Sequence, residues 1–294
     1  MKKITKAVIP AAGLGTRMLP ISRTVPKEIL PIVDRPSMEY LVREAVGAGI
    51  KDILIITGRN KEAIENYFDY SIEYKDVLQA KNKLKELSDM EEVCSLANVY
   101  FLRQKEAKGL GHAVLCAEEF VGDEPFAVLY GDDVMVAETP VTKQLCDVAE
   151  KYDKAVVGVC EVPFEDIRKY CSMKTETQYD DRTYLTTDMV EKPQTREEMF
   201  SNLAILGRVV LTPDIFDILK HTAPGKGGEL QLTDAMKELA RTKGVISYKY
   251  EGRRYDMGSK LGFLQANIET ALEHPEIKDA FRAYLKDLYD GLYK

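Results

Sequence analysis

Near its start the chain carries the sequence VIPAAGLGTR (residues 8–17), in which an apolar run passes directly into a glycine-rich turn. A strand that ends in such a turn presents free backbone N–H groups, which bind phosphate. The turn is not a dinucleotide fingerprint, because Met18 stands where G-x-G-x-x-G has its third glycine, and the chain has no Walker A sequence. Two cations follow instead, Arg17 and Lys27. Mobile positive charge beside glycine amides predicts a loop that binds a reacting nucleoside triphosphate.

Composition limits the class of protein. A chain of 294 residues with 45% hydrophobic and 30% charged residues is typical of a globular enzyme with a full core. A net charge of −7 and the lack of a basic tract argue against a general nucleic-acid binder. The five cysteines include no C-x-x-C pair, which is typical of reduced thiols. We find no signal peptide and no apolar stretch of the ~20 residues that span a bilayer, so we expect a cytoplasmic protein without membrane contact.

Apolar runs alternate with amphipathic stretches over the first 160 residues, and this alternation predicts a mostly parallel sheet. We predict strands over residues 4–10, 53–57, 99–102, 126–130 and 155–159, and helices over residues 38–48, 61–68, 111–119 and 141–152. The highly charged stretch 75–89 predicts a solvated helix inserted before the third strand.

The second part of the chain has a different pattern. We predict antiparallel strands at 170–175 and 183–190, strands at 202–211 and 245–250, and helices at 214–220, 232–242, 260–271 and 275–293. Ligands of α/β sheets bind at the carboxyl ends of the parallel strands. The glycine turn and the sequence Gly131-Asp132-Asp133 should therefore face one cleft.

Eight segments together resemble the bacterial UTP–glucose-1-phosphate uridylyltransferases, within the sugar-phosphate nucleotidylyltransferase family. They occur in family order and reach to about residue 270. The segments are AAGLGTR (11–17), PKEILPIVDRP (26–36), QKEAKGLGHAVLCA (104–117), GDD (131–133), VEKP (190–193), SNLAILGR (201–208), GKGGELQLTDA (225–235) and RYDMG (254–258).

The resemblance implies an α/β fold: a Rossmann-like, mostly parallel mixed sheet flanked by helices, with an antiparallel sugar-binding elaboration and C-terminal helices. It implies a nucleotidylyltransferase domain over residues 1–273 and a helical extension over 274–294. The implied reaction transfers uridylyl from UTP to glucose 1-phosphate, giving UDP-glucose and pyrophosphate by Mg²⁺-assisted in-line displacement. Such catalysis rests on positioning and charge neutralisation. The three histidines form no H-x-H pair, which argues against the uridylyltransferases that use a histidine nucleophile.

Three cations are the candidate catalytic residues. The guanidinium of Arg17 makes forked contacts with phosphate oxygens and would neutralise charge as pyrophosphate leaves. The resemblance places Lys27 at the triphosphate and Lys192 at the attacking sugar phosphate. Each is, on its own, an ordinary surface cation.

The candidate metal ligands are carboxylates. Asp132 and Asp133 follow a buried strand, where unpaired carboxylates are costly unless a cation or hydrogen bonds compensate them. Hard oxygen ligands at a phosphate site indicate Mg²⁺. The family pattern favours Asp132 together with Asp256, and Asp133 is the alternative.

The remaining candidates bind the nucleoside and the sugar. The amide of Gln104 carries a donor and an acceptor, so it can pair with the imide edge of uracil. The resemblance adds the backbone N–H of Gly109 at the base, Ala11, Ala12, Gly13 and Gly15 along the nucleotide, and Glu28 as a further acceptor. On the sugar side it implies Glu191, Lys192, Asn202 and the turn 227–229.

One departure and several alternatives bear on specificity. Cys171 stands where the family commonly has a glycine that meets the sugar. The sister thymidylyltransferases and a non-catalytic regulatory paralogue that binds a nucleotide sugar are the rival functions. The regulatory function is disfavoured, because a protein that only binds need not keep all the charged candidate residues (Arg17, Lys27, Asp132, Lys192 and Asp256). From the family we expect a homodimer or homotetramer, and no nucleic-acid partner.

Overall fold

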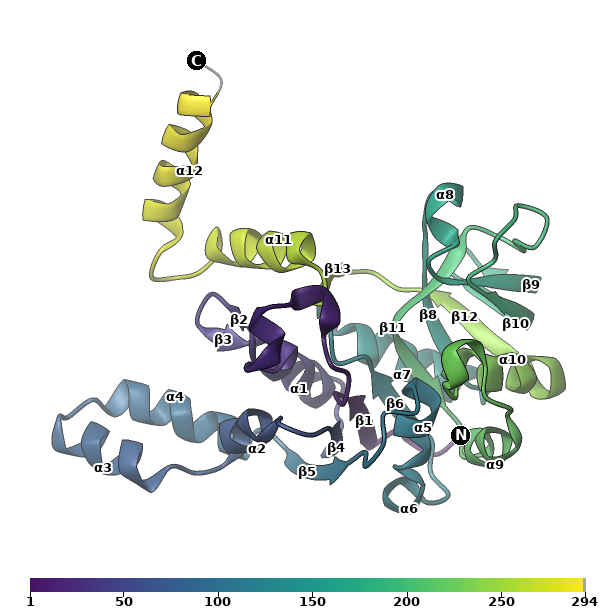
Figure 1. Cartoon of the computed structure of the whole chain (residues 1–294), viewed down its shortest axis with the longest axis horizontal. Helices are drawn as coiled ribbons and strands as arrows, with labels where there is room; N and C mark the ends of the chain where they lie inside the picture. Colours follow the sequence, from purple (N-terminus) through teal and green to yellow (C-terminus); the bar gives the residue numbers. More distant parts are fainter. Residues whose placement is uncertain (293–294) are drawn as a thin grey trace.

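A nine-stranded mixed sheet runs through the computed structural model, which describes residues 1–292 (Figure 1). Its strand order is β5-β4-β1-β6-β11-β8-β12-β10-β9, and only β11 and β10 run against the others. The predicted mostly parallel sheet with an antiparallel elaboration is confirmed. The strands are β1 (Lys6–Pro10), β4 (Asp52–Thr57), β5 (Asn98–Arg103), β6 (Phe126–Leu129), β8 (Val156–Glu161), β9 (Cys171–Asp180), β10 (Thr183–Glu191), β11 (Leu203–Leu211) and β12 (Val245–Lys249).

Helices cover both faces of this sheet, and each face has its own apolar core. Successive side chains of β1 point to opposite faces of the sheet, so Ala7 and Ile9 belong to one core and Val8 belongs to the other. The first core includes residues of α1 and α7, and the second includes residues of α5, α9 and α10. The main helices are α1 (Ser37–Gly47), α2 (Glu62–Phe68), α5 (Leu110–Leu115), α6 (Glu118–Val121), α7 (Val141–Tyr152), α9 (Asp214–His221), α10 (Leu232–Lys243), α11 (Lys260–Ala271) and α12 (Lys278–Leu292).

Two predicted helices are each divided in two. The insertion before β5 forms α3 (Ile72–Ala80) and α4 (Leu84–Ser95), joined by a turn in which Asn82 has a φ of 53°. Asparagine tolerates this left-handed conformation, which ends a helix. The predicted helix 111–119 is α5 and α6. The described part of the predicted extension is α12, which stands off the body beyond α11 (Figure 1); residues 293–294 lie outside the described residues. No helix in residues 1–292 is long and apolar enough to cross a membrane.

A small ribbon that the sequence did not predict carries part of the candidate site. β7 (Asp133–Val136) and β13 (Arg253–Asp256) pair in antiparallel register, with Asp256 opposite Asp133. The two strands have four residues each, and most of β13 is charged, so neither has the apolar alternation that predicts a strand. Their pairing places Asp256 beside the Asp132-Asp133 turn although Asp256 lies 124 positions after Asp132 in the chain.

A buried ion pair fixes this ribbon to the central sheet. Arg208 on β11 is 1% exposed, and its Nη2 donates to Glu44 Oε2 at 2.6 Å and to the Asp133 carbonyl at 2.9 Å. Glu44 on α1 also accepts from the Thr142 backbone N–H at 2.9 Å and hydroxyl at 2.7 Å. One carboxylate thereby connects α1, α7 and β11, and its arginine holds the start of β7.

Replacement of Arg208 by methionine will leave Glu44 buried without its cation. We expect the free energy of unfolding, measured by urea denaturation, to fall by about 3–5 kcal/mol. The matched control is Lys143→Met, which breaks the exposed pair between Lys143 and Asp147 and should cost less than about 1 kcal/mol. Equal losses in the two variants would contradict the structural role given to Arg208.

Candidate active site

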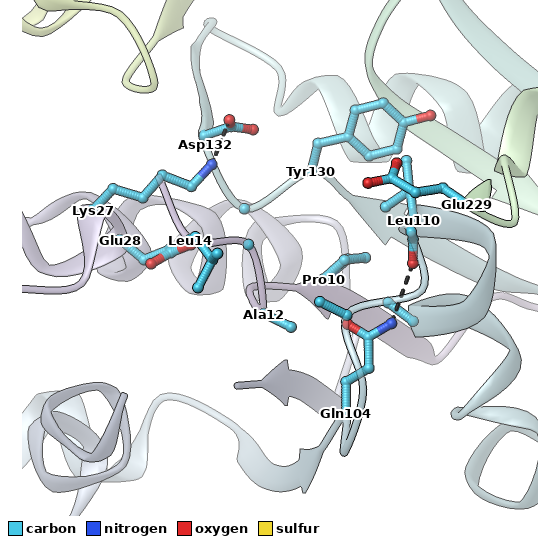
Figure 2. Close-up of a pocket in the computed structure, with 15 residues that line it drawn as sticks. Pro10, Ala12, Leu14, Lys27, Glu28, Gln104, Leu110, Tyr130, Asp132 and Glu229 are labelled. Atoms are coloured by element: carbon cyan, nitrogen blue, oxygen red, sulfur yellow. Dashed lines mark hydrogen bonds and ion pairs between the residues drawn. The ribbon is translucent and has the colours of Figure 1, made fainter. Parts of the chain in front are cut away.

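A cavity of about 420 Å³ opens at the carboxyl ends of β1 and β6 (Figure 2). The glycine loop and the turn that contains Asp132 both line it, so the prediction that they share one cleft is confirmed. Its walls also carry predicted residues from three other segments. The lining residues predicted from the sequence are Ala12, Gly13, Lys27, Glu28, Gln104, Gly109, Asp132 and Glu229. Ala11 is buried beneath the loop, where its N–H donates to the Ile56 carbonyl at 2.8 Å.

The glycine loop depends on Gly15. This residue has a φ of 66°, which favours glycine, and a Cβ there would lie 3.3 Å from the side chains of Lys27 and Ser22. The Ser22 hydroxyl donates to the Gly15 carbonyl at 2.8 Å. Gly15 therefore lets Lys27 pass close to the loop and reach the cavity. A Cβ on Gly13, in contrast, would meet no atom within 4 Å, so this glycine leaves open space along the loop.

Arg17 and Lys27 contact the two predicted metal ligands. Lys27 Nζ lies 2.6 Å from Asp132 Oδ2, a pair that Figure 2 shows at the cavity. Arg17 reaches Asp256 Oδ2 at 3.0 Å and Asp132 Oδ2 at 3.5 Å. Burial opposes the charged form of Lys27, but Asp132 and Glu28 raise its pKa above the usual value. Burial likewise favours neutral Asp132, yet Lys27 and Arg17 lower its pKa. Both members of the pair are therefore charged.

Asp133 faces away from this network. Its Oδ1 lies 2.6 Å from Nη2 of Arg254, and it is 4% exposed. Burial raises its pKa to about 6, although Arg254 opposes the shift. Gly207 makes room for it, because a Cβ at this position would lie 2.9 Å from Asp133 Oδ2. Of the two adjacent aspartates, Asp132 is the one that lies with Asp256.

The space beside Gly258 fits a small cation. A Cβ on Gly258 would lie 2.5 Å from Arg17 Nη2, 2.8 Å from Asp132 Oδ2 and 3.0 Å from Asp256 Oδ1, so the guanidinium and both carboxylate oxygens border one small volume that a side chain would fill. The Gly258 N–H donates to Asp256 Oδ1 at 2.9 Å and orients it. Residues 1–292 contain no cluster of three or more acidic, histidine or cysteine ligands. Two carboxylates suit Mg²⁺, which takes its other ligands from phosphate and water.

Gln104 and Gly109 form one end of the cavity. Gln104 Nε2 donates to the Gly109 carbonyl at 3.2 Å and lies 2.8 Å from Nδ1 of His112 (Figure 2 shows the first bond). Gly109 has a φ of 95°, and a Cβ on it would lie 2.8 Å from the Leu230 carbonyl and from the Glu229 side chain. The glycine is thus required by the close approach of residues 229–230. This contact brings the predicted GKGGELQLTDA segment to the cavity.

Lys61 is a site residue that the sequence analysis missed. Its Nζ lies 2.8 Å from each carboxylate oxygen of Glu28 and also donates to the Ala11 carbonyl. Burial raises the pKa of Glu28, and Lys61 opposes that shift. The ion pair joins the start of the glycine loop to the residue that follows Lys27. A lone lysine before a helix gives no sequence signal for this role.

A second cavity of about 220 Å³ adjoins the first, with Leu110 and Tyr130 in the walls of both. Glu191 and Lys192 line it, and Lys192 Nζ lies 3.2 Å from Glu191 Oε1. Cys171 is paired with Glu191 in the β9–β10 register and lies in the wall with its side chain buried.

The predicted turn 227–229 is not in the wall of this second cavity, and its Glu229 lines the first cavity instead. Asn202 is also absent from the second cavity's wall. It lies just before β11, where its carbonyl accepts from the Val162 N–H at 3.0 Å. Arg254, which the sequence analysis did not single out, lines the cavity in its place and carries a positive charge there. Its only sequence signal is its position in the RYDMG segment, two residues before Asp256.

Comparison with known proteins identifies relatives of this chain. A family model for nucleotidyl transferases matches residues 6–274. The UTP–glucose-1-phosphate uridylyltransferase YngB of Bacillus subtilis is 51% identical over 287 residues, which are 98% of this chain and 96% of that protein. The structure of UTP-bound UGPase from Acinetobacter baumannii is 37% identical in sequence and superposes with a TM-score of 0.89. The match covers 97% of this chain and 99% of that chain. A UDP-glucose pyrophosphorylase complexed with UDP-glucose is 42% identical with a TM-score of 0.84, covering 92% and 100%.

Substitution of Gly258 by alanine will place a methyl group between Asp132 and Asp256. We expect the affinity for Mn²⁺ in the presence of UTP, measured by isothermal titration calorimetry, to fall at least about tenfold, because a shift of about 1 Å at such a site is costly. The control is Gly291→Ala, where a Cβ meets nothing within 4 Å. Unchanged Mn²⁺ affinity in Gly258→Ala would show that the ion binds elsewhere.

Proposed function

The chain belongs to the nucleotidyl transferase family, and we propose that it transfers uridylyl from UTP to glucose 1-phosphate, giving UDP-glucose and pyrophosphate. The observation that carries the proposal is the pair of adjoining cavities. One is lined by the glycine loop, Lys27 and Asp132, and the other is lined by Lys192 and Glu191. Identity of 51% to a uridylyltransferase over nearly the whole chain supports the choice of substrates.

UTP occupies the larger cavity in this proposal. The backbone of Ala12 and Gly13 lies along the nucleoside, and Gln104 and Gly109 contact the base. The triphosphate meets Arg17 and Lys27, which exchange their contacts with Asp132 and Asp256 for phosphate oxygens. Glu28, held by Lys61, keeps the loop in place. The ion pairs of the free protein thus preserve the positions that the substrate later uses.

Glucose 1-phosphate occupies the smaller cavity, where Glu191 accepts hydrogen bonds from sugar hydroxyls and Lys192 binds the phosphate. From there a phosphate oxygen attacks the α-phosphorus of UTP in line, and pyrophosphate leaves towards Arg17. No side chain becomes a covalent intermediate, so positioning and charge neutralisation supply the rate enhancement. Tyr130 and Leu110 form the common wall, and they keep the two substrates in the order that the displacement needs.

Mg²⁺ is the proposed metal, and Asp132 and Asp256 would hold it. Enzymes of this family generally use a divalent metal ion. A bound Mg²⁺ neutralises phosphate charge as the α-phosphorus is attacked. The arrangement of carboxylates and the space beside Gly258 support this pair over Asp133, whose carboxylate is directed at Arg254.

Pyrophosphate release tests the function directly. With Mg²⁺ and glucose 1-phosphate, the purified protein should release pyrophosphate with UTP at a kcat/KM well above that with dTTP, because the proposal assigns it to the uridylyl branch. A dTTP preference would move it to the thymidylyltransferases. No release with any triphosphate, from folded protein that binds UDP-glucose, would make the regulatory function correct.

A homodimer or homotetramer formed through the C-terminal helices is part of the same proposal. α12 has no buried residue, and one of its faces presents Tyr284 and Leu288 at 59% and 43% exposure. α11 adds Leu261 and Leu264. Such a row of large apolar side chains on a protruding helix indicates a protein interface. The cytoplasmic location likewise stays a prediction.

The oligomer proposal predicts the effect of one charge on α12. Leu288→Asp should lower the mass measured by size-exclusion chromatography with light scattering to that of a 33.2 kDa monomer, because a carboxylate cannot be buried in an apolar interface without a partner. Lys286→Asp, on the same helix, is the control and should leave the mass unchanged. A wild-type protein that is already monomeric would overturn the proposal.

A further inference from the structure

The side-chain amide of Gln104 is held on its donor side only. Nε2 carries two hydrogens, and its two neighbours are the Gly109 carbonyl at 3.2 Å and His112 Nδ1 at 2.8 Å. Both hydrogens are therefore used. Among the described residues, no group donates to Oε1, and Figure 2 shows this oxygen on the side of the amide that faces Ala12 and the cavity. Gln104 thus offers the cavity a hydrogen-bond acceptor.

The direction of this amide follows from the chemistry of its neighbours. A backbone carbonyl can only accept, so the group that faces Gly109 must be the NH₂. Nδ1 of His112 must then accept as well, which places the imidazole proton on Nε2. Burial and the nearby Lys108 lower the pKa of His112, so the ring is neutral near pH 7 and its Nδ1 lone pair is free. The Cys116 thiol is the other neighbour of Nδ1, at 3.9 Å.

We propose that His112 is a positioning residue that fixes Gln104 as an acceptor and thereby makes the base site select a pyrimidine with an N3–H donor. The inference rests on the proposed function, in which Gln104 contacts the base of UTP. Uracil donates its N3–H to Gln104 Oε1. Cytosine has an unprotonated N3, which would face the same oxygen as a second acceptor and leave two buried lone pairs without a donor. Thymine shares the uracil imide, so His112 separates UTP and dTTP from CTP and not from each other.

The geometry explains why a histidine performs this task better than the Gly109 carbonyl alone. The Gly109 contact is the longer of the two, and the second amide hydrogen would otherwise have no partner. Without His112, the 3.2 Å contact with the Gly109 carbonyl alone would oppose a 180° rotation of the amide, which would set Oε1 against that carbonyl and present NH₂ to the base. An amide that presents NH₂ can donate to the unprotonated N3 of cytosine. Discrimination between the two bases therefore depends on a residue that touches neither.

The test compares kcat/KM for UTP and CTP in three proteins. The wild type should prefer UTP by at least about 100-fold, as sites built around a specific hydrogen bond do. His112→Leu removes the acceptor and should reduce the UTP:CTP ratio at least about tenfold. His112→Asn carries Oδ1 at nearly the position of Nδ1, so it should keep the ratio within about threefold of the wild type. A ratio in His112→Leu equal to that of the wild type overturns the inference.

A second measurement covers the other outcomes. The chain has three histidines, so the ¹⁵N spectrum of histidine-labelled wild-type protein resolves the tautomer of each ring. A proton on Nε2 of His112 supports the inference, and a proton on Nδ1 overturns it even if His112→Leu fails to fold. If the wild type releases no pyrophosphate with UTP, the proposed function fails. In that case calorimetry gives the dissociation constants for UTP and CTP in the same three proteins. A preference for UTP that falls at least about tenfold in His112→Leu but not in His112→Asn supports the inference, and an unchanged preference in His112→Leu overturns it.

Discussion

Two carboxylates from distant parts of the chain, Asp132 and Asp256, share one cation, because Arg17 contacts both, at 3.5 Å and 3.0 Å. Lys27 adds a second positive charge at 2.6 Å from Asp132. Like charges held this close repel unless cations lie between them. In the free protein Arg17 and Lys27 supply that compensation, and in the proposed complex a metal ion and the triphosphate replace it. The rest of the active site depends on this balance of charges.

The fold positions the network through backbone pairing and one buried ion pair. β7 and β13 pair so that Asp256 lies opposite Asp133, directly after Asp132. Arg208 holds the Asp133 carbonyl and Glu44, which connects this ribbon to α1. Small residues then provide the space, since a side chain at Gly258 would occupy the volume between the two carboxylates. The positions of the two carboxylates are therefore set by strand pairing and by a buried ion pair.

The sequence predicts the parts of the site in which a turn directly follows a strand along the chain. The glycine turn after the first strand and the turn at Asp132 could be placed in one cleft, because parallel strands end at the same edge of a sheet. Contacts between distant residues could not be predicted from local order, and the pairing of Asp132 with Asp256 came from the family resemblance alone. Lys61 contacts Glu28 and the Ala11 carbonyl, and His112 contacts Gln104, but a lone lysine or histidine has no periodicity or motif that marks it. The β7–β13 ribbon could not be predicted either, since both strands are short and most of β13 is charged.

The most direct test of the account is a crystal structure with Mn²⁺ and a non-hydrolysable UTP analogue, in which the anomalous signal of manganese locates the metal. The account predicts a peak between the carboxylates of Asp132 and Asp256, next to Gly258. It also predicts Lys27 Nζ on a phosphate oxygen in place of Asp132. A manganese peak away from either aspartate, with Lys27 still paired to Asp132, would contradict the central claim that these carboxylates and cations exchange partners when the substrate binds.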